Sequence, residues 1–255
     1  MKGLRVLSVL TMAVLGGCGG QFIISAPDQV APVGGTSAAV VRVRRTELAF
    51  LPLAVSGAAL RLQIADAAPR GARSDKHGYA AALVPVPKQE GTYALTIRHQ
   101  NTDGEEASAS VPAYVWGSNA RIIALDMDCL PEGGKEGQDA KLALSRLAGG
   151  AKLLYLTAKT DLNTDRLHQS LKARELPDGP ILSWHLAGRF GKEITPLPRL
   201  KKAFPGLDTG VCGSPTAAGA FTQAGMKCIL VGKAGAGSEK AAVRNSWAEL
   251  ASKGL

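Results

Sequence analysis

Two aspartates directly follow an apolar run near the middle of the chain. Residues 121–131 read RIIALDMDCLP, which places Asp126 and Asp128 two residues apart at the end of a strand-sized segment. Carboxylates at that spacing need not share a role, because one can lie in line with a phosphorus atom while the other meets the leaving oxygen. An Asp-x-Asp pair on its own is more often a solvated loop, so its weight depends on the residues that accompany it.

A phosphoryl-transfer site also needs groups that bind the phosphate oxygens. A lysine and a hydroxyl would stabilise the equatorial oxygens of a transferred phosphoryl group. A divalent cation held by Asp126 and Asp128 would offset the repulsion between carboxylate and phosphate.

Strand-like and helical runs alternate from residue 119 onward. The expected strands are 121–126, 152–157, 180–185, 209–212 and 227–231. The expected helices are 138–147, 163–173, 197–203, 217–224 and 239–252. This alternation predicts a doubly wound α/β domain, with helices on both faces of a parallel sheet. Ligands bind beyond the carboxyl ends of such strands, where Asp126, Thr157 and Cys212 all fall.

The N-terminal half has a different pattern, in which short apolar or alternating runs are separated by turn residues. These runs cover residues 22–25, 38–43, 58–64, 80–86, 93–99 and 107–115. Their spacing predicts an antiparallel β-sandwich of immunoglobulin-like type, without a disulfide because the segment contains no cysteine. We therefore expect domains at 19–117 and 118–255. The first resembles bacterial immunoglobulin-like surface modules in texture, which implies a spacer or interaction role.

The first eighteen residues are typical of a secretory signal. A basic start is followed by the apolar run 6–15 and by Leu-Gly-Gly-Cys18. This ending resembles the lipobox of bacterial lipoproteins, which implies cleavage before Cys18 and lipidation of its sulfur. The alternative is an ordinary signal peptide with a chance cysteine. We expect an exported protein tethered to a membrane of the cell envelope, with its globular part outside the cytoplasm.

The residues from 119 to 250 resemble the haloacid dehalogenase superfamily. The sequences AKLLYLTA at 151–158 and LPDGP at 176–180 resemble especially the lipin and Nir-type phosphatase-like domain. The resemblance implies Asp126 as nucleophile and Asp128 as general acid and base. It also implies Thr157 as the hydroxyl that holds the phosphoryl group.

The same resemblance implies a basic residue in the site and a magnesium ion. Lys192 is the preferred basic residue, with Lys201 and Lys202 as rivals. Residues 210–225 align in frame with the family's fourth motif, but Gly213 and Ala217 stand where its magnesium-binding acids belong. The cation would lose its main protein ligands there, so the resemblance implies a degenerate phosphatase site.

The cysteines suggest a second hypothesis for the site around Asp126 and Asp128. In the first motif, Cys129 and Leu130 replace the family's Gly-Thr. The resemblance makes the first and fourth strands neighbours, so Cys129 and Cys212 could form a disulfide or bind a soft metal with the aspartates. The alternative is that both are small buried residues, and we expect Cys228 in the core.

The net positive charge of the chain favours some classes of binding partner over others. The chain carries a formal charge of +9, and residues 119–255 contain nineteen Lys and Arg against thirteen Asp and Glu. This excess favours an anionic ligand or membrane surface, although a solvated basic face is the commoner explanation. No basic cluster is interleaved with aromatics, which argues against nucleic acid.

Three hypotheses follow for the activity. The first is a non-catalytic domain that binds a phosphorylated or anionic ligand, or an envelope partner. The second is a metal-dependent phosphomonoesterase that acts on a lipid or surface phosphate through Asp126, and the third is a structural envelope scaffold.

Overall fold

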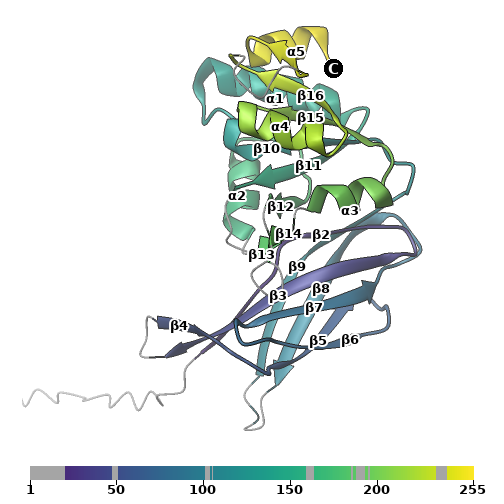
Figure 1. The fold of residues 1–255 in the computed structure, drawn as a ribbon, viewed down its shortest axis with the longest axis vertical. Helices are drawn as coiled ribbons and strands as arrows, with labels where there is room; N and C mark the ends of the chain where they lie inside the picture. Colours follow the sequence, from purple (N-terminus) through teal and green to yellow (C-terminus); the bar gives the residue numbers. More distant parts are fainter. Residues whose placement is uncertain are drawn as a thin grey trace, which may run out of the picture.

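The computed structural model describes residues 21–47, 51–100, 104, 106–158, 164–184, 186–187, 193–194, 196–233 and 240–255. Figure 1 shows two β-sheets at one end of the molecule and a helix-covered sheet at the other. Strands before residue 117 build the first part, and the helices of the described residues lie in the second. Lys192 and Cys18 lie outside the described residues.

The N-terminal part consists of two sheets. Sheet A contains β1 (Phe22–Ser25), β3 (Thr36–Glu47), β4 (Leu51–Ala54) and β7 (Tyr79–Pro85). Sheet B contains, in spatial order, β2 (Gln29–Pro32), β9 (Glu106–Trp116), β8 (Gly91–Gln100), β5 (Ala59–Ile64) and β6 (Arg70–Arg73). All pairs are antiparallel except β2 with β9, which is parallel.

Alternating side chains make this part a sandwich. On β3, Val41 and Val43 are fully buried, and on β5 Leu62 and Ile64 are as well. They meet in one apolar cluster between the sheets. This period of two puts the intervening polar residues outside. The predicted sandwich of two sheets is therefore confirmed.

The C-terminal part is built on a six-stranded parallel sheet. Its spatial order is β12 (Ile181–Ser183), β11 (Lys152–Thr157), β10 (Ile122–Asp126), β15 (Leu207–Cys212), β16 (Lys227–Val231) and β17 (Ala242–Arg244). The order turns back between β10 and β15, which are direct neighbours. A separate short pair, β13 (Leu186–Ala187) and β14 (Glu193–Ile194), is antiparallel.

Helices cover both faces of this sheet. They are α1 (Gly134–Ala148), α2 (Asp165–Ala173), α3 (Pro196–Ala203), α4 (Pro215–Gln223) and α5 (Trp247–Lys253), besides the short 3-10 helix η1 (Met127–Cys129). Apolar residues of α1, α2 and α5 pack on one face, and those of α3 and α4 pack on the other. The prediction of one helix over 239–252 was wrong for Ala242–Arg244, which pair with β16 as an edge strand. No described helix is long and apolar enough to cross a membrane.

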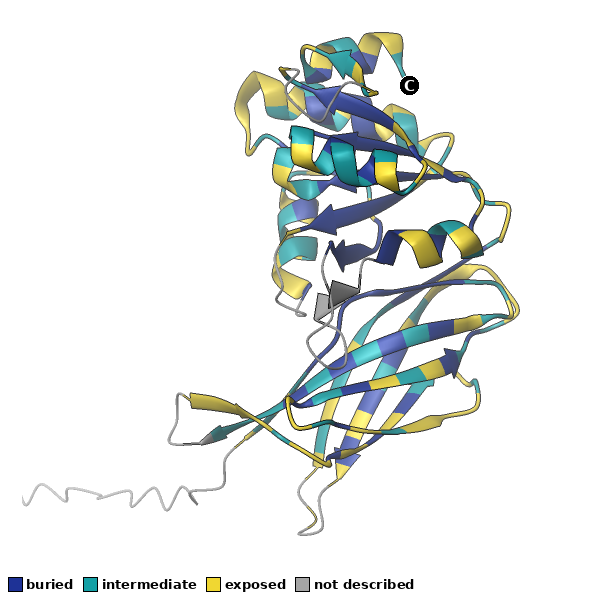
Figure 2. Cartoon of the chain, in the orientation of Figure 1, coloured by how far each residue is buried: buried dark blue, intermediate teal, exposed yellow. Residues whose placement is uncertain are grey.

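The two parts share one apolar core. Tyr114 and Trp116 of β9 belong to the same cluster as Leu197, Leu200 and Phe204 around α3. The rings of Trp116 and Phe204 lie 6.1 Å apart in an edge-on arrangement. In Figure 2 the buried residues continue from one part into the other. The chain therefore changes pattern near residue 117, but the packing does not stop there.

A buried carboxylate adds a polar tie between the parts. Asp28, which precedes β2, is 1% exposed. It accepts hydrogen bonds from Thr164 Oγ1, His168 Nε2 and the backbone N–H of Ile181, each at 2.7 Å. These partners lie at least 136 residues away in the sequence, so nothing local in the sequence indicates the network.

Candidate functional site

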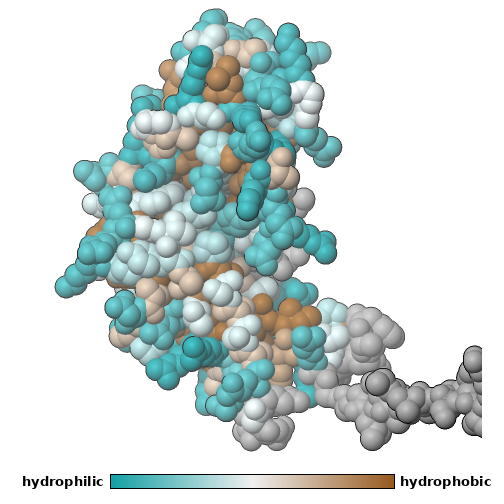
Figure 3. All heavy atoms as spheres, turned by 180° about the vertical axis from the view of Figure 1, so that it is seen from behind, coloured by the Kyte–Doolittle hydropathy of each residue, from teal (hydrophilic) through white to brown (hydrophobic). Residues whose placement is uncertain are grey.

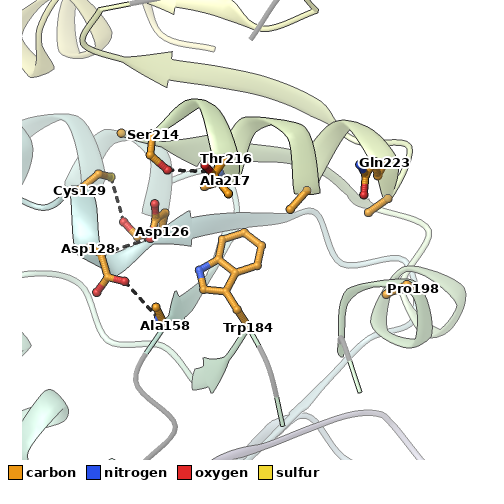
Figure 4. A pocket seen from close by; sticks show the side chains of 13 residues that line it. Asp126, Asp128, Cys129, Ala158, Trp184, Pro198, Ser214, Thr216, Ala217 and Gln223 are labelled. Atoms are coloured by element: carbon orange, nitrogen blue, oxygen red, sulfur yellow. Dashed lines mark hydrogen bonds between the residues drawn. The ribbon is translucent and has the colours of Figure 1, made fainter. Parts of the chain in front are cut away.

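A pocket of about 540 Å³ opens at the carboxyl ends of β10 and β15. This is the point where the strand order turns back, and such switch points are the usual ligand crevices of open α/β sheets. The pocket is lined by Asp126, Asp128, Cys129, Ala158, Trp184, Pro198, Gly213, Ser214, Thr216, Ala217, Ala220, Gln223 and Ala224. Figure 4 shows the two aspartates at one end of it and α4 along its length.

Asp126 is the most buried acid of the site. It ends β10 and is 4% exposed. Its Oδ1 accepts a hydrogen bond of 3.2 Å from the backbone N–H of Asp128, and Gly213 and Trp184 line the same pocket. Burial raises the pKa of Asp126 above its usual range, while the hydrogen bond from Asp128 opposes part of that rise. The group that the sequence predicts as a nucleophile is therefore largely buried.

Asp128 is exposed and is held by the neighbouring strand. It lies in η1, one turn after Asp126. Its Oδ2 accepts a hydrogen bond of 3.1 Å from the backbone N–H of Ala158, just beyond β11. The contact is drawn in Figure 4. One carboxylate oxygen of Asp128 is therefore used to join the ends of β10 and β11.

The remaining predicted residues divide into two groups. Thr157 ends β11 as expected and is 3% exposed, but the adjacent Ala158, and not Thr157, lines the pocket. Lys192 lies outside the described residues, so its prediction stays a prediction. Among the described lining residues there is no lysine, arginine or histidine.

The beginning of α4 offers few free donors to the pocket. Ser214 is its N-cap, and the Ser214 hydroxyl accepts from the N–H of Ala217 at 3.2 Å. Pro215 follows and has no N–H. A helix N-terminus favours anions through its unpaired N–H groups, and here the cap and the proline remove two of them.

Gly213 and Cys129 are sterically matched. A Cβ atom added to Gly213 would lie 2.3 Å from the Cβ atom of Cys129. A side chain at position 213 would therefore require Cys129 or the backbone around it to shift. The resemblance gives the family a glycine at position 129 and an acid at position 213, so this chain has the small residue and the larger one exchanged.

The donor set does not fit the magnesium ion that the resemblance implies. Mg²⁺ requires near-octahedral oxygen ligands, usually including carboxylates. Gly213 and Ala217 supply no side-chain oxygen, which leaves Asp126 and Asp128 as the carboxylates that line the pocket. Within the described ranges, no three His, Cys, Asp or Glu residues are grouped so that they could hold a metal ion.

The cysteines pair differently from the predicted thiol pair. Cys212 Sγ lies 3.4 Å from Cys228 Sγ, because β15 and β16 are neighbours and the two residues face the same side. Cys129 instead donates from its thiol to the backbone oxygen of Asp126 at 2.9 Å. All three thiols are free. Burial raises the pKa of Cys129, which keeps it protonated and poor as a metal ligand.

Trp184 is the large aromatic residue of the pocket lining. It follows β12, lines the pocket and packs edge-on against Phe221 of α4, with ring centroids 4.9 Å apart. The small residues of α4 that line the pocket were predicted only as a helix face. Their signal was the alanine-rich run 217–224, which leaves room where larger side chains would close the cavity.

Comparisons with known proteins give only distant likenesses. No family model matches the chain, and no curated protein matches it. A carbohydrate acetylesterase from Xanthomonas citri is similar over 79% of this chain and 57% of its own, with 12% identity and a TM-score of 0.36. The tandem immunoglobulin repeats of Dlar are similar over 42% of this chain and 59% of theirs, with 12% identity and a TM-score of 0.28. The chain thus spans less than two thirds of either structure.

Proposed function

We propose that residues 118–255 form a haloacid dehalogenase-like domain whose pocket binds a ligand without catalysing phosphate transfer. The strand order supports the family, because the first and fourth strands of the sheet are neighbours as the resemblance requires. The two aspartates after the first strand support it as well.

The donor set of the pocket carries the non-catalytic part of the proposal. Transfer of a phosphoryl group to a carboxylate needs a cation that offsets the repulsion between carboxylate and phosphate. Gly213 and Ala217, which line the pocket, supply no side-chain oxygen for such a cation. Burial also raises the pKa of Asp126, which disfavours its ionised form. In the proposal, Asp126 organises the end of the pocket and does not react.

The exchange at positions 129 and 213 explains why the metal site was lost. Cys129 fills the volume that an acid at position 213 would need. Because the cation would be the partner that lets a phosphate approach two carboxylates, its loss removes the chemistry but leaves the cavity.

The residues that line the pocket indicate that part of the ligand is apolar. Six of its residues are apolar or aromatic, namely Ala158, Trp184, Pro198, Ala217, Ala220 and Ala224. A ligand with a flat or narrow apolar part would lie along α4 against the indole of Trp184. The anionic group of the ligand is assigned to Lys192 from the sequence, together with the basic excess of residues 119–255.

We propose that the rest of the chain holds this pocket at a membrane of the cell envelope. In the proposal, Cys18 carries the lipid anchor and the sandwich holds the pocket away from the lipid. The shared core around Trp116 and Phe204 supports a fixed presentation of the pocket.

Naphthyl phosphate and naphthol test the binding proposal, since they share an apolar body and differ in the phosphate. Residues 19–255, which retain every described residue, would be titrated with both by calorimetry. Ala220→Phe places a large ring in the pocket and is expected to weaken binding about tenfold or more. Ala173→Phe, on the exposed side of α2, is the matched control and should bind as the wild type does.

Two results would contradict the binding proposal or its anionic part. Equal affinity of Ala220→Phe and the wild type would contradict binding in this pocket. Lys192→Ala should weaken binding of naphthyl phosphate but not of naphthol. If naphthol binds as tightly as its phosphate and Lys192→Ala changes neither, the pocket takes a neutral ligand and the anionic assignment fails.

A metal-dependent phosphomonoesterase is the second candidate. The observation in its favour is that Asp126 and Asp128 line the same end of the pocket. Release of phosphate from the same probe separates it from the first proposal.

A further inference from the structure

A second pocket lies on sheet B of the sandwich, away from the aspartates. Its volume is about 540 Å³, and its lining includes Arg61 of β5, Arg98 of β8 and Ser108 of β9. These three residues are exposed, whereas Leu62 and Ile97 beside them are fully buried in the core. The period of two therefore puts both arginines on the outer face of the sheet. In Figure 3, hydrophilic side chains are spread over the sandwich among smaller apolar patches.

The strand register brings the two arginines face to face. Arg61 on β5 is opposite Arg98 on β8, and Arg98 is opposite Ser108 on β9. Side chains that are directly opposite on one face have Cβ atoms about 4.5–5.5 Å apart. Two like charges at that spacing destabilise a sheet, and an anion that lies between them would reverse the effect.

Among the described residues, no acid forms an ion pair with either arginine. The ion pairs of that part of the chain involve other side chains. Glu106 lines the same pocket, but its carboxylate accepts a hydrogen bond of 3.0 Å from Gln100 Nε2. The described lining thus contains two arginines against one carboxylate, and that carboxylate already has a partner.

Position 71 leaves the space beside the arginines open. Gly71 on β6 is opposite Arg61, and it carries no side chain. A Cβ atom added there would meet the backbone oxygen of Leu60 at 4.0 Å, an ordinary contact distance. A ligand that reaches this face would therefore meet a row of two guanidinium groups and the hydroxyl of Ser108 across β5, β8 and β9.

We propose that Arg61, Arg98 and Ser108 bind the phosphate or sulfate group of a ligand, at a site distinct from the pocket at Asp126. An arginine donates parallel hydrogen bonds to an oxyanion, and two arginines on one face can share it. The hydroxyl of Ser108 adds a third donor group. The bound anion offsets the repulsion between the guanidinium groups, so that binding stabilises the sheet. The site gives the sandwich a binding role of its own.

A titration followed by nuclear magnetic resonance tests the site. Residues 19–255 would be titrated with glucose 6-phosphate and glucose 6-sulfate, and with glucose as the neutral match. The side-chain N–H signals of Arg61 and Arg98 and the amide of Ser108 should shift with the anions and not with glucose. Binding of either anion supports the site, and the tighter one identifies its oxyanion. Equal shifts with glucose would overturn the proposal.

Substitutions separate this site from a general attraction of anions to the chain. Arg61→Gln with Arg98→Gln should weaken binding about 25-fold, at about fivefold for each exposed ion pair. Arg121→Gln with Arg166→Gln is the matched control, because it removes the same charge from two exposed arginines of the α/β part. It should bind as the wild type does, and an equal loss in this control would contradict the proposal.

Two further observations locate the bound anion. Glu106→Gln keeps an acceptor for Gln100 and should strengthen binding about two- to fivefold, because a negative charge leaves the pocket. Weaker binding by this variant would count against an anion in the pocket. Shifts at Gly213 without shifts at Ser108 would place the probe in the pocket at Asp126 and would likewise overturn the site on sheet B.

A double-mutant cycle tests whether the anion joins the two arginines. Urea unfolding of the wild type, Arg61→Gln, Arg98→Gln and the double variant gives their coupling. Without a probe, Arg98→Gln should be more favourable in the wild type than in the Arg61→Gln background, because it relieves repulsion. With saturating glucose 6-phosphate the order should reverse, because the substitution then removes a ligand contact. The same coupling with and without the probe would overturn the proposal.

Discussion

At the scale of single residues, the site is defined by an exchange of volume between two positions. Gly213 leaves room for Cys129, and Cys129 leaves no room for a side chain at position 213. An acid would fit at position 213 only together with a smaller residue at position 129. In the proposed degenerate site, the missing acid at position 213 and the cysteine at position 129 are thus one change and not two.

This pairing predicts a strong coupling in a double-mutant cycle. Gly213→Ala should cost about 1–3 kcal/mol in the wild type, because its methyl group would overlap Cys129. In a Cys129→Gly background the same substitution should cost little, since the overlap is gone. Urea unfolding of the four proteins measures the coupling. An equal cost of Gly213→Ala in both backgrounds would contradict the steric account.

The sequence was sufficient to place the acids but not to describe their state. Asp126 follows a strand of apolar residues, so its position at a strand end could be predicted. That Trp184 lines the same pocket depends on the path of the chain after β12, which no local pattern encodes. The contact of Cys212 with Cys228 was missed for a related reason, because it depends on the register between two strands.

At the scale of elements, α4 determines the shape of the pocket. It starts at the Ser214 cap, and its alanines leave the cavity open along one side. Phe221 points the other way into the core, where the absence of a Cβ on Gly210 gives its ring room. The helix is therefore fixed by its buried face while its other face stays small.

The cap of α4 can be tested directly. Ser214→Ala removes the acceptor for the N–H of Ala217 and should destabilise the protein by about 1 kcal/mol. Ser214→Asp, which keeps an acceptor, should retain most of the stability. Thermal unfolding compares the three proteins, and equal stability of Ser214→Ala and the wild type would show that the cap contributes nothing.

Elements that are compact apolar runs could be predicted, and exposed or polar ones could not. The expected bounds of β1, β11 and β16 match the structure, because each is a compact apolar run. β4 and β6 were missed, since β4 is exposed throughout and β6 reads RGAR. Residues 242–244 have apolar spacing that fits a helix, yet the open edge of β16 takes them as a strand.

At the scale of the whole molecule, a buried acid and an aromatic core make the two parts one unit. Asp28 comes from the sandwich and its three partners come from the α/β part. Trp116 and Phe204 meet across the same boundary. We therefore expect both parts to unfold together.

Removal of the buried carboxylate should be costly. Asp28→Ala leaves the hydroxyl of Thr164 and the N–H of Ile181 without an acceptor, and breaking a buried polar pair costs about 3–5 kcal/mol. Calorimetry should show one transition in the wild type. Two separate wild-type transitions, or an unchanged midpoint in Asp28→Ala, would contradict the coupling.

The same network makes stability depend on pH. The hydrogen bond to Asp28 raises the pKa of His168 above its usual 6.5, and the charges of Asp28, Asp178 and Asp165 act in the same direction against burial. A raised folded-state pKa means that the protonated ring stabilises the fold. This contribution is fully present below pH 6.5 and is lost as the pH rises through the raised value.

His168→Gln keeps a donor but cannot titrate. The difference in free energy of unfolding between the wild type and His168→Gln should therefore shrink as the pH rises from about 6 to 9. Urea unfolding across that range gives the difference. A difference that grows with pH would have the opposite sign from the one expected.

Release of phosphate tests the central claim most directly. Residues 19–255 would be incubated with naphthyl phosphate and with phosphatidic acid in the presence of Mg²⁺, Mn²⁺ or Zn²⁺, beside an Asp126→Asn control of verified folding. The account predicts no metal-dependent release by the wild type and no difference from Asp126→Asn. Metal-dependent release that Asp126→Asn abolishes would contradict it, and would make this pocket the active site of a phosphatase.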